Sequence, residues 1–205
     1  RLLYFSQVIF YLSSILKADG NDVELFDTTY YEKLDESAGA EVDSDKIKTD
    51  KLMARPYDMP NEITLKKSNV FLDFKQKVES FGPDLLAVSC TEDMFEIGIS
   101  LLRQVRKYKI PTILGGVFAT FAPDLALRFD EIDIVCKGEG EDALKSLCRR
   151  MRTGKRYDDI SNLWIKNKDG SIKTNPTTMV DMDKNPLIDM EIFEEARFYR
   201  PMGGK

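Results

Sequence analysis

The sequence predicts an α/β fold, in which a sheet of parallel strands carries helices on both faces. The prediction depends on two short apolar runs that both stop at glycines. The run that ends at Leu114 is followed by Gly115-Gly116, and residues 132–136 are followed closely by Gly138. A helical pattern separates the two runs, as in a βαβ crossover. Apolar strands that end in glycines are typical of the sheet edge where a ligand approaches bare backbone.

The other elements follow from apolar periodicity and from turn residues. In the first helix Val8, Leu12, Ile15 and Leu16 share one face, and Gly20 ends it. The remaining expected elements are, in chain order, a strand at 23–26, an amphipathic helix at 68–81 capped by Ser68 or Asn69, a strand at 85–88 that is apolar on both faces, a helix at 94–108, a strand at 112–114, a short helix near 124–128, a strand at 132–136 and a helix at 141–151.

A β-hairpin and a linker are expected after these elements. Residues 161–174 hold two short strand patterns around Asp169-Gly170, which is a hairpin signal. The residues that follow have proline and acidic spacing without sustained periodicity. We therefore divide the chain into an α/β domain at 1–156 and a hairpin with a linker at 157–205.

Two segments deviate from the pattern of a doubly wound sheet. Such a sheet begins with the strand that becomes central, whereas this chain enters a helical pattern soon after residues 1–5. Either residues 1–5 are a short piece of that strand, or the strand is missing from this sequence, and we expect the latter. Residues 28–67 are polar and weakly periodic, so we expect them to form an insertion or a lid.

Composition excludes several classes of function. The 205 residues carry a formal charge of -5, contain no histidine and include three cysteines, Cys90, Cys136 and Cys148. The lack of histidine excludes Ser-His and Cys-His nucleophilic pairs and His-ligated zinc. A negative charge argues against a nucleic-acid partner, and no apolar run reaches the roughly 18 residues of a membrane span. Cysteines without close pairs indicate reduced thiols and a cytoplasmic location.

Five segments taken together, in this order, carry a family resemblance. They are FYLSSILKADGNDVELFD, GPDLLAVSCT, PTILGGVFATFAPDLAL, DIVCKGEGEDAL, and DISNLWIKNKDGSIKTNP followed by MVDMDKNPLIDMEIF. This chain resembles the cobalamin (B12)-binding domain found at the N-terminus of many radical S-adenosylmethionine (SAM) enzymes. The resemblance implies a flavodoxin-like (Rossmann-like) sheet. It aligns residues 115–120 with the family's Gly-Gly-Pro-His-Ala-Thr loop, and residues 138–141 with its Gly-Glu-Gly-Glu turn.

The departures from the family pattern refine what the resemblance implies. Val117-Phe118 stands where the family commonly has Pro-His, and the Asp-x-His-x-x-Gly motif is absent. Cobalamin would therefore bind base-off and without a histidine ligand. No Cys-x-x-x-Cys-x-x-Cys motif occurs, so SAM and a [4Fe–4S] cluster would belong to a barrel domain absent from this sequence. The implied role is to present cobalamin to that barrel for methyl transfer, and the chain alone would be inactive.

The resemblance places the cofactor-binding residues at the strand ends. Gly115 and Gly116 would let the nucleotide tail of cobalamin lie against backbone, or they form a tight turn with positive φ. Ser89 and Thr91 would donate hydrogen bonds to the tail, or they close the strand and cap the next helix. The full set of candidates is Ser89, Cys90, Thr91, Gly115, Gly116, Val117, Thr120, Gly138, Glu139 and Gly140.

For several residues in this set or beside it we favour a structural role. Glu139 and Glu141 complement the dipole of the helix that follows. Phe121 is expected in the core, and Cys90 is interpreted as a small buried apolar residue, not a cobalt ligand. The cations in residues 149–156 are explained by their position at a helix C-terminus.

Two other functions stay open at this point. A domain of the same fold could lack cobalamin and act as a scaffold or docking module for the barrel. Alternatively, the chain could be an independent nucleotide- or sugar-binding α/β domain.

Overall fold

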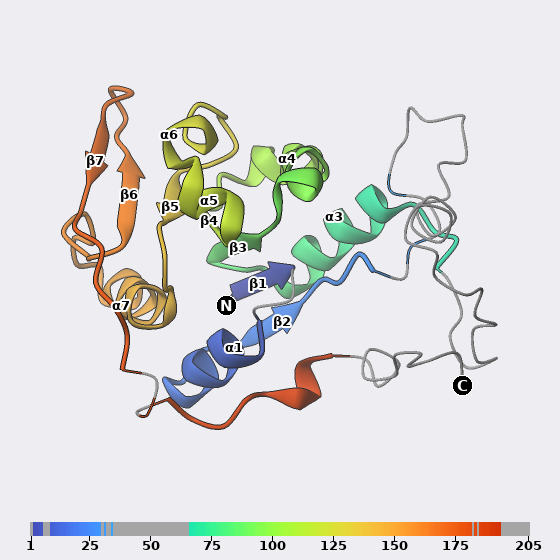
Figure 1. Cartoon of the computed structure of the whole chain (residues 1–205). Coiled ribbons are helices and arrows are strands. Elements are labelled where there is room, and N and C mark those ends of the chain that lie inside the picture. Colours follow the sequence, from blue (N-terminus) through green and yellow to red (C-terminus); the bar gives the residue numbers. More distant parts are fainter. Residues whose placement is uncertain are drawn as a thin grey trace, which may run out of the picture.

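The computed structural model describes the backbone of residues 2–5 and residues 9–29, 31, 34, 66–181, 183 and 185–193 of the chain. Within these residues it contains a seven-stranded sheet in the order β2-β1-β3-β4-β5-β6-β7 (Figure 1). The strands are β1 (Leu2–Phe5), β2 (Val23–Leu25), β3 (Leu85–Ser89), β4 (Thr112–Gly115), β5 (Ile134–Cys136), β6 (Leu163–Lys166) and β7 (Ile172–Thr174).

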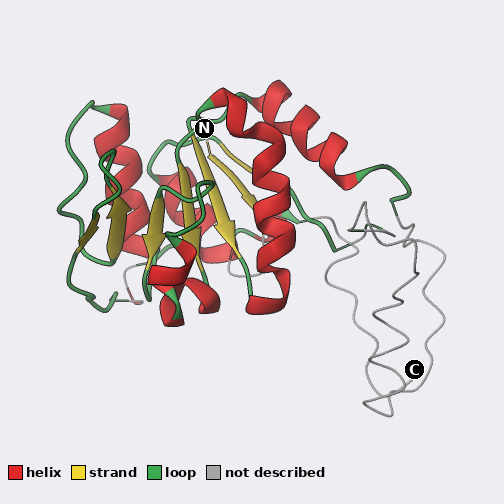
Figure 2. Cartoon of the chain, turned by 90° about the horizontal axis from the view of Figure 1, so that it is seen from above, coloured by secondary structure: helices red, strands yellow, loops and turns green. Residues whose placement is uncertain are grey.

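The first five strands are parallel, and β6 and β7 are antiparallel. The order 2-1-3-4-5 is that of the flavodoxin-like fold. This part of the prediction is confirmed. Seen from above, the parallel strands point in one direction, so that their carboxyl ends form one edge of the sheet (Figure 2).

Helices cover both faces of the sheet, because successive side chains of a strand point to opposite faces. Leu86 and Val88 of β3 pack with the helices α3, α4, α5 and α6, whereas Leu85 and Ala87 pack with α1 and α7. This explains why β3 is apolar at every position from Leu85 to Val88. The helices are α1 (Ile9–Ala18), α3 (Val70–Phe81), α4 (Phe95–Val105), α5 (Val117–Phe121), α6 (Pro123–Ala126) and α7 (Glu141–Arg152), with short 3-10 turns η1 (Glu92–Met94), η2 (Arg106–Tyr108) and η4 (Met190–Ile192).

The prediction that the first strand is missing is wrong. Leu2–Phe5 forms β1 and occupies the central position that the fold requires, between β2 and β3. Leu2 pairs with Val23 on one side and with Leu85 on the other. A run of four residues is too short to show a strand period by itself, and only its two partners define it.

The ends of the segment predicted as an insertion or lid, 28–67, lie side by side through an isolated bridge between Tyr31 and Lys66. Most of this segment lies outside the described residues. The helix that follows it begins as expected: the side chain of Asn69 accepts hydrogen bonds from the N–H groups of Phe71 and Leu72.

The predicted hairpin joins the same sheet, since β6 pairs with β5. The residues after it, interpreted above as a linker, run back along α1 (Figure 1). The Asp189 N–H donates to the Phe10 carbonyl (3.0 Å), and Lys17 forms an ion pair with Asp189 (2.6 Å). The rings of Phe10 and Phe193 have centroids 4.4 Å apart. The domain division at 156/157 stays a prediction.

Candidate cofactor-binding site

The carboxyl ends of β3, β4 and β5 lie next to one another in register. Ser89 at the end of β3 is paired with Gly115 at the end of β4, and Leu114 is paired with Val135 of β5. The loops that follow these strands therefore begin on one edge of the sheet. The structure brings all ten predicted cofactor-binding residues to this edge or to the element that follows it.

Gly116 is required by the fold itself. Its φ is +91°, a conformation that residues with a Cβ rarely adopt. A Cβ at this position would lie 2.9 Å from Ser89 Oγ and 3.0 Å from the Cys90 carbonyl oxygen. The turn explanation therefore accounts for Gly116 completely.

Gly115 has no such requirement. Its backbone is that of a strand, and a Cβ there would meet nothing closer than the Val88 carbonyl oxygen at 4.0 Å. The residue is partly exposed at the sheet edge. The protein has room for a side chain at Gly115, so the fold itself does not require glycine at this position.

Thr120 links the loops after β4 and β5. Its hydroxyl donates to the Gly116 carbonyl (3.0 Å) and accepts from the Gly138 N–H (3.1 Å). Both hydrogen-bonding roles of the hydroxyl are used within the protein. Thr120 therefore shapes the edge, and its hydroxyl proton is not free to be donated to a ligand.

Glu139 has a structural role, as expected, although the partner differs from the helix dipole that we considered. Its carboxylate accepts a hydrogen bond from the Val180 N–H in the segment after the hairpin. Its carbonyl accepts from Asn162 Nδ2 (2.8 Å), and the same amide reaches the Thr178 carbonyl (3.0 Å). Asn162 is buried and has a φ of +68°. These hydrogen bonds thus join the Gly-Glu-Gly-Glu turn to the segment after the hairpin.

Asn162 was missed by the sequence reasoning. Asparagine is enriched among non-glycine residues with positive φ, so its place just before a strand was a usable signal.

Glu141 differs from Glu139 in having no visible partner. It begins α7, only 9% of its surface is exposed, and its Oε2 has no hydrogen-bond partner within the described residues. It was assigned a structural role with Glu139 and was left out of the predicted site. A carboxylate directly after the Gly138–Gly140 turn was the signal that could have included it.

Ser89 is a buried residue, and no hydrogen bond within the described residues occupies its hydroxyl. Thr91 is exposed, and although it precedes η1 its side chain makes no capping hydrogen bond. The capping alternative therefore fails for Thr91. Both hydroxyls remain available to a ligand.

Cys90 is buried, as predicted. Burial, with a smaller effect of the Asp93 charge, raises the pKa of its thiol to about 12. The thiol is therefore protonated near neutral pH, whereas a metal ligand has to be a thiolate. Among the described residues no group of three or more His, Cys, Asp and Glu side chains could hold a metal ion.

The helix α5 presents two apolar side chains to solvent beside the diglycine. Val117 is 61% exposed and Phe121 is 84% exposed. The prediction that Phe121 belongs to the core is wrong, because residues four apart share one helix face and this face points outward. Phe118 lies on the other face and packs on Phe95, with ring centroids 4.3 Å apart.

Two cavities lie away from the diglycine. One of about 550 Å³ lies between the end of β2 and α3 and is lined by Phe26, Lys66 and Gln76, among others. Another of about 300 Å³ lies beside α7 and includes Glu139 and Asn162. Neither cavity includes Gly115 or Gly116.

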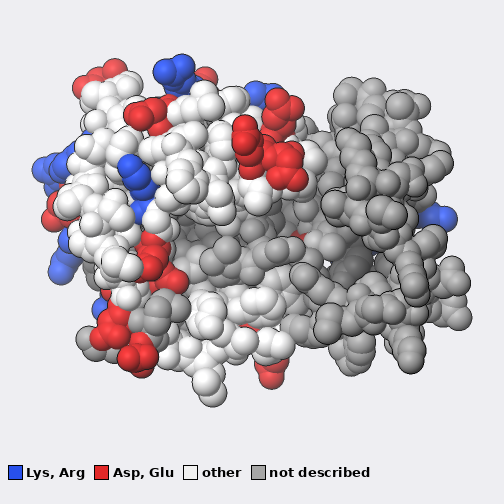
Figure 3. Space-filling model, viewed as in Figure 1, with Lys and Arg blue, Asp and Glu red and all other residues white. Residues whose placement is uncertain are grey.

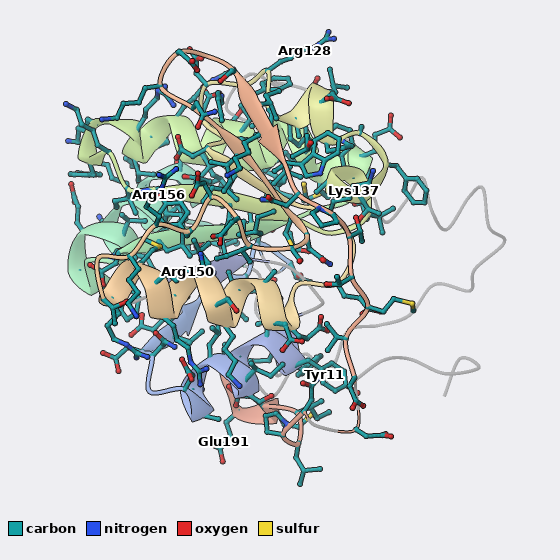
Figure 4. All side chains as sticks on the ribbon, turned by 90° about the vertical axis from the view of Figure 1, so that its left-hand side faces the viewer. Tyr11, Arg128, Lys137, Arg150, Arg156 and Glu191 are labelled. Carbon is teal, nitrogen blue, oxygen red and sulfur yellow. The ribbon has the colours of Figure 1, made fainter. Side chains whose placement is uncertain are left out.

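Charge is mixed across the face in Figure 3, where small groups of both signs border an uncharged surface. The predicted basic cluster lies at the far end of α7: Figure 4 shows Arg150 and Arg156 on one side and Lys137, which follows β5, on the other. These arginines are paired with Asp159 and Asp158. The cluster is thus not part of the site.

Comparison with known proteins agrees with this geometry. Residues 62–148 match the family model of the B12 binding domain. The resemblance to cobalamin-binding domains is confirmed.

Two solved structures share the fold of this chain at 16% sequence identity. One is the radical SAM methyltransferase TsrM from Kitasatospora setae with a tryptophan substrate and a SAM analogue bound (TM-score 0.59; 85% of this chain and 30% of that chain). The other is the cobalamin-dependent SAM radical enzyme OxsB with aqua-cobalamin and SAM bound (TM-score 0.58; 87% and 22%). The chain therefore spans less than a third of either protein. No curated protein matches the sequence.

Among the described helices, none combines the length and the apolar character needed to cross a membrane.

Proposed function

We propose that this domain binds cobalamin at the carboxyl edge of β3, β4 and β5. The single observation that carries the proposal is Gly115, whose lack of a side chain the fold does not require. Its backbone is bare at the point where the B12 binding domain match and the neighbouring glycine turns coincide. Bare backbone at the end of a parallel strand suits the nucleotide tail of the cofactor.

The residues of the edge fit the cofactor in kind. Ser89 and Thr91 offer hydroxyl groups that can donate to the tail. Val117 and Phe121 offer an exposed apolar surface beside it, suited to the rim of the corrin ring. Gly116, Thr120 and the turn at 138–140 hold the loops in place without using up these groups.

We propose further that cobalamin is bound base-off and without a protein ligand from histidine. The chain contains no histidine, and Phe118, which stands where the family commonly has one, is packed against Phe95. When bound, cobalamin supplies a cobalt centre able to carry a methyl group, and the protein supplies position and exclusion of water.

The larger protein in this proposal is a radical SAM enzyme. The proteins that share the fold are such enzymes and are several times longer than the matched domain. SAM and the [4Fe–4S] cluster would bind to a barrel in the same parent chain, and the reaction would be methyl transfer. The three free, buried cysteines support a reducing, cytoplasmic location.

One observation favours a second candidate, a scaffold of the same fold without cobalamin. Neither of the two cavities described above includes the diglycine. A preformed pocket is the usual sign of a small-molecule site.

An absorption titration separates the two candidates. Hydroxocobalamin is titrated into the protein, with cobinamide, which lacks the nucleotide, as the spectral reference for a cobalt without the tail base. Saturable binding at micromolar concentrations with a cobinamide-like spectrum supports the base-off site. An unchanged spectrum is resolved by equilibrium dialysis of the coloured cofactor: saturable binding there retains the site and rejects the base-off state, and no binding supports the scaffold.

A further inference from the structure

Glu141 carries a buried oxygen atom that nothing in the described part of the chain satisfies. The residue is 91% buried, and its Oε2 has no hydrogen-bond partner there. Buried side-chain oxygens in folded proteins nearly always have a partner, because an unpaired one loses its hydration without compensation. A group of this kind calls for a partner that the described residues do not supply.

The helix dipole does not explain the inward position of Glu141. A carboxylate in the first turn of α7 is favoured by the dipole wherever it points. The next residue, Asp142, has this benefit while exposed to solvent. The dipole therefore accounts for acidic residues at this helix start, but not for the burial of one of them.

The residue before Glu141, Gly140, faces Cys136 at the end of β5 and Leu12 of α1. A Cβ on the preceding Gly140 would lie 3.5 Å from Cys136 Sγ and 3.8 Å from Leu12 Cδ2. The thiol of Cys136 is directed to the Glu139 carbonyl (3.7 Å), and Leu12 has no donor. Glycine at position 140 leaves backbone exposed towards this space, as Gly115 does on the neighbouring strand.

We propose that Glu141 Oε2 accepts a hydrogen bond from a ribose hydroxyl in the nucleotide tail of cobalamin. The inference rests on the proposed function and adds the part of the cofactor that is recognised. The corrin ring is too wide to enter between two packed helices, whereas the tail is narrow. Within the tail, the phosphate repels a carboxylate and the free base nitrogen is an acceptor. The ribose hydroxyls are the neutral donors.

Access to this atom requires a small rearrangement. Oε2 is out of reach of solvent, and the half-buried side chain of Leu12 lies beside Gly140. A shift of this side chain would open a path from the edge.

The test compares two ligands with three variants of the protein. Glu141→Met removes both carboxyl oxygens at similar length, Glu141→Gln keeps a neutral acceptor, and Asp142→Asn is the matched control. We expect Glu141→Met, which loses the buried hydrogen bond, to weaken hydroxocobalamin binding about tenfold. Glu141→Gln retains an acceptor and should weaken binding less. Cobinamide, which lacks the ribose, should bind all four proteins equally.

Two results would overturn the inference, and they are distinguishable from failure of the proposed function. Equal weakening of both ligands would show that Glu141 acts on the protein and not on the tail. Unchanged cobalamin binding by Glu141→Met would show that it makes no contact. If the unmodified protein binds neither ligand, the proposed function and this inference fall together.

Thermal unfolding without ligand gives an independent readout. An unpaired buried oxygen destabilises the protein, so Glu141→Met should raise the melting temperature relative to Asp142→Asn, which loses a charge at the same helix start. A melting temperature below that of Asp142→Asn would mean that Glu141 is satisfied in solution, and would contradict the proposal.

Discussion

The Thr120 hydroxyl accepts a hydrogen bond from the Gly138 N–H at 3.1 Å and so fixes the loop after β4 to the loop after β5. The same hydroxyl donates to the Gly116 carbonyl. One short side chain thus sets the distance between the diglycine turn and the Gly-Glu-Gly-Glu turn. The edge proposed to hold cobalamin is therefore a single unit in which two loops move together.

Replacing Thr120 tests this link. Thr120→Val keeps the shape but leaves the Gly138 N–H without its acceptor, so we expect a loss of about 1 kcal/mol in the free energy of unfolding. Urea unfolding followed by circular dichroism measures it. Thr120→Ser retains the hydroxyl and should lose less than half as much. Equal losses for the two variants would assign the effect to the methyl group.

The two adjacent glycines should respond differently to alanine. Gly116→Ala combines a positive φ with a Cβ that would lie 2.9 Å from Ser89 Oγ, and we expect it to lower the free energy of unfolding by about 2 to 4 kcal/mol. Gly115→Ala should leave it unchanged or raise it by up to about 1 kcal/mol, since alanine is favoured over glycine in a strand. Similar losses at both positions in urea unfolding would show that Gly115 is also structural.

Asn162 should hold the segment after the hairpin against the rest of the domain. Its Oδ1 accepts from the Thr178 N–H (2.8 Å), and its Nδ2 donates to the Glu139 carbonyl. Asn162→Gly tolerates the positive φ and removes these bonds, so we expect a loss of about 2 to 3 kcal/mol and faster proteolysis within residues 175–181. The control is Asn167→Gly at the exposed hairpin turn. If cleavage is no faster than in that control, residues 175–181 are held by other contacts.

Acid should remove the contribution of Asp19. The hydrogen bond from Arg149 (2.7 Å) and the charges of Arg149 and Arg152 hold the pKa of Asp19 below its ordinary value of 3.8. Because the folded pKa is depressed, the contribution is complete above the unfolded pKa and is lost as the pH falls through the folded pKa. Asp19→Asn should cost about 0.5 to 1 kcal/mol at about pH 7 and progressively less below about pH 4.

Urea midpoints of both proteins at the two ends of this range measure the difference. Other acidic groups are unchanged between the two proteins, so the comparison isolates Asp19. A difference that stays constant down to about pH 3 would mean that the ion pairs do not contribute.

The parallel sheet and the site edge could be predicted from the sequence because both depend on local patterns. Residues 85–88 of β3 are all apolar, and β4 and β5 are followed by glycines or stop at small residues, so their common edge followed. β1 could not be recognised, since four residues carry no period and the strand is defined by its pairing with β2 and β3.

The individual roles at the edge depend on tertiary contacts and were harder to predict. Phe121 and Phe118 are both aromatic in one short helix, and only packing on Phe95 decides which one is inside. Glu139 and Glu141 look equivalent in the sequence. The N–H of Val180, which is distant in the chain, donates to the Glu139 carboxylate. The Glu141 carboxylate stays buried, and its Oε2 is unpaired within the described residues.

The dissociation constant of hydroxocobalamin for the unmodified protein and for Gly115→Val, obtained from one absorption titration of each, tests the central claim most directly. The account predicts saturable micromolar binding by the unmodified protein. It predicts binding at least about tenfold weaker for Gly115→Val, whose free energy of unfolding should be close to that of the unmodified protein. Equal affinity of the two proteins, or no binding by either, would contradict it.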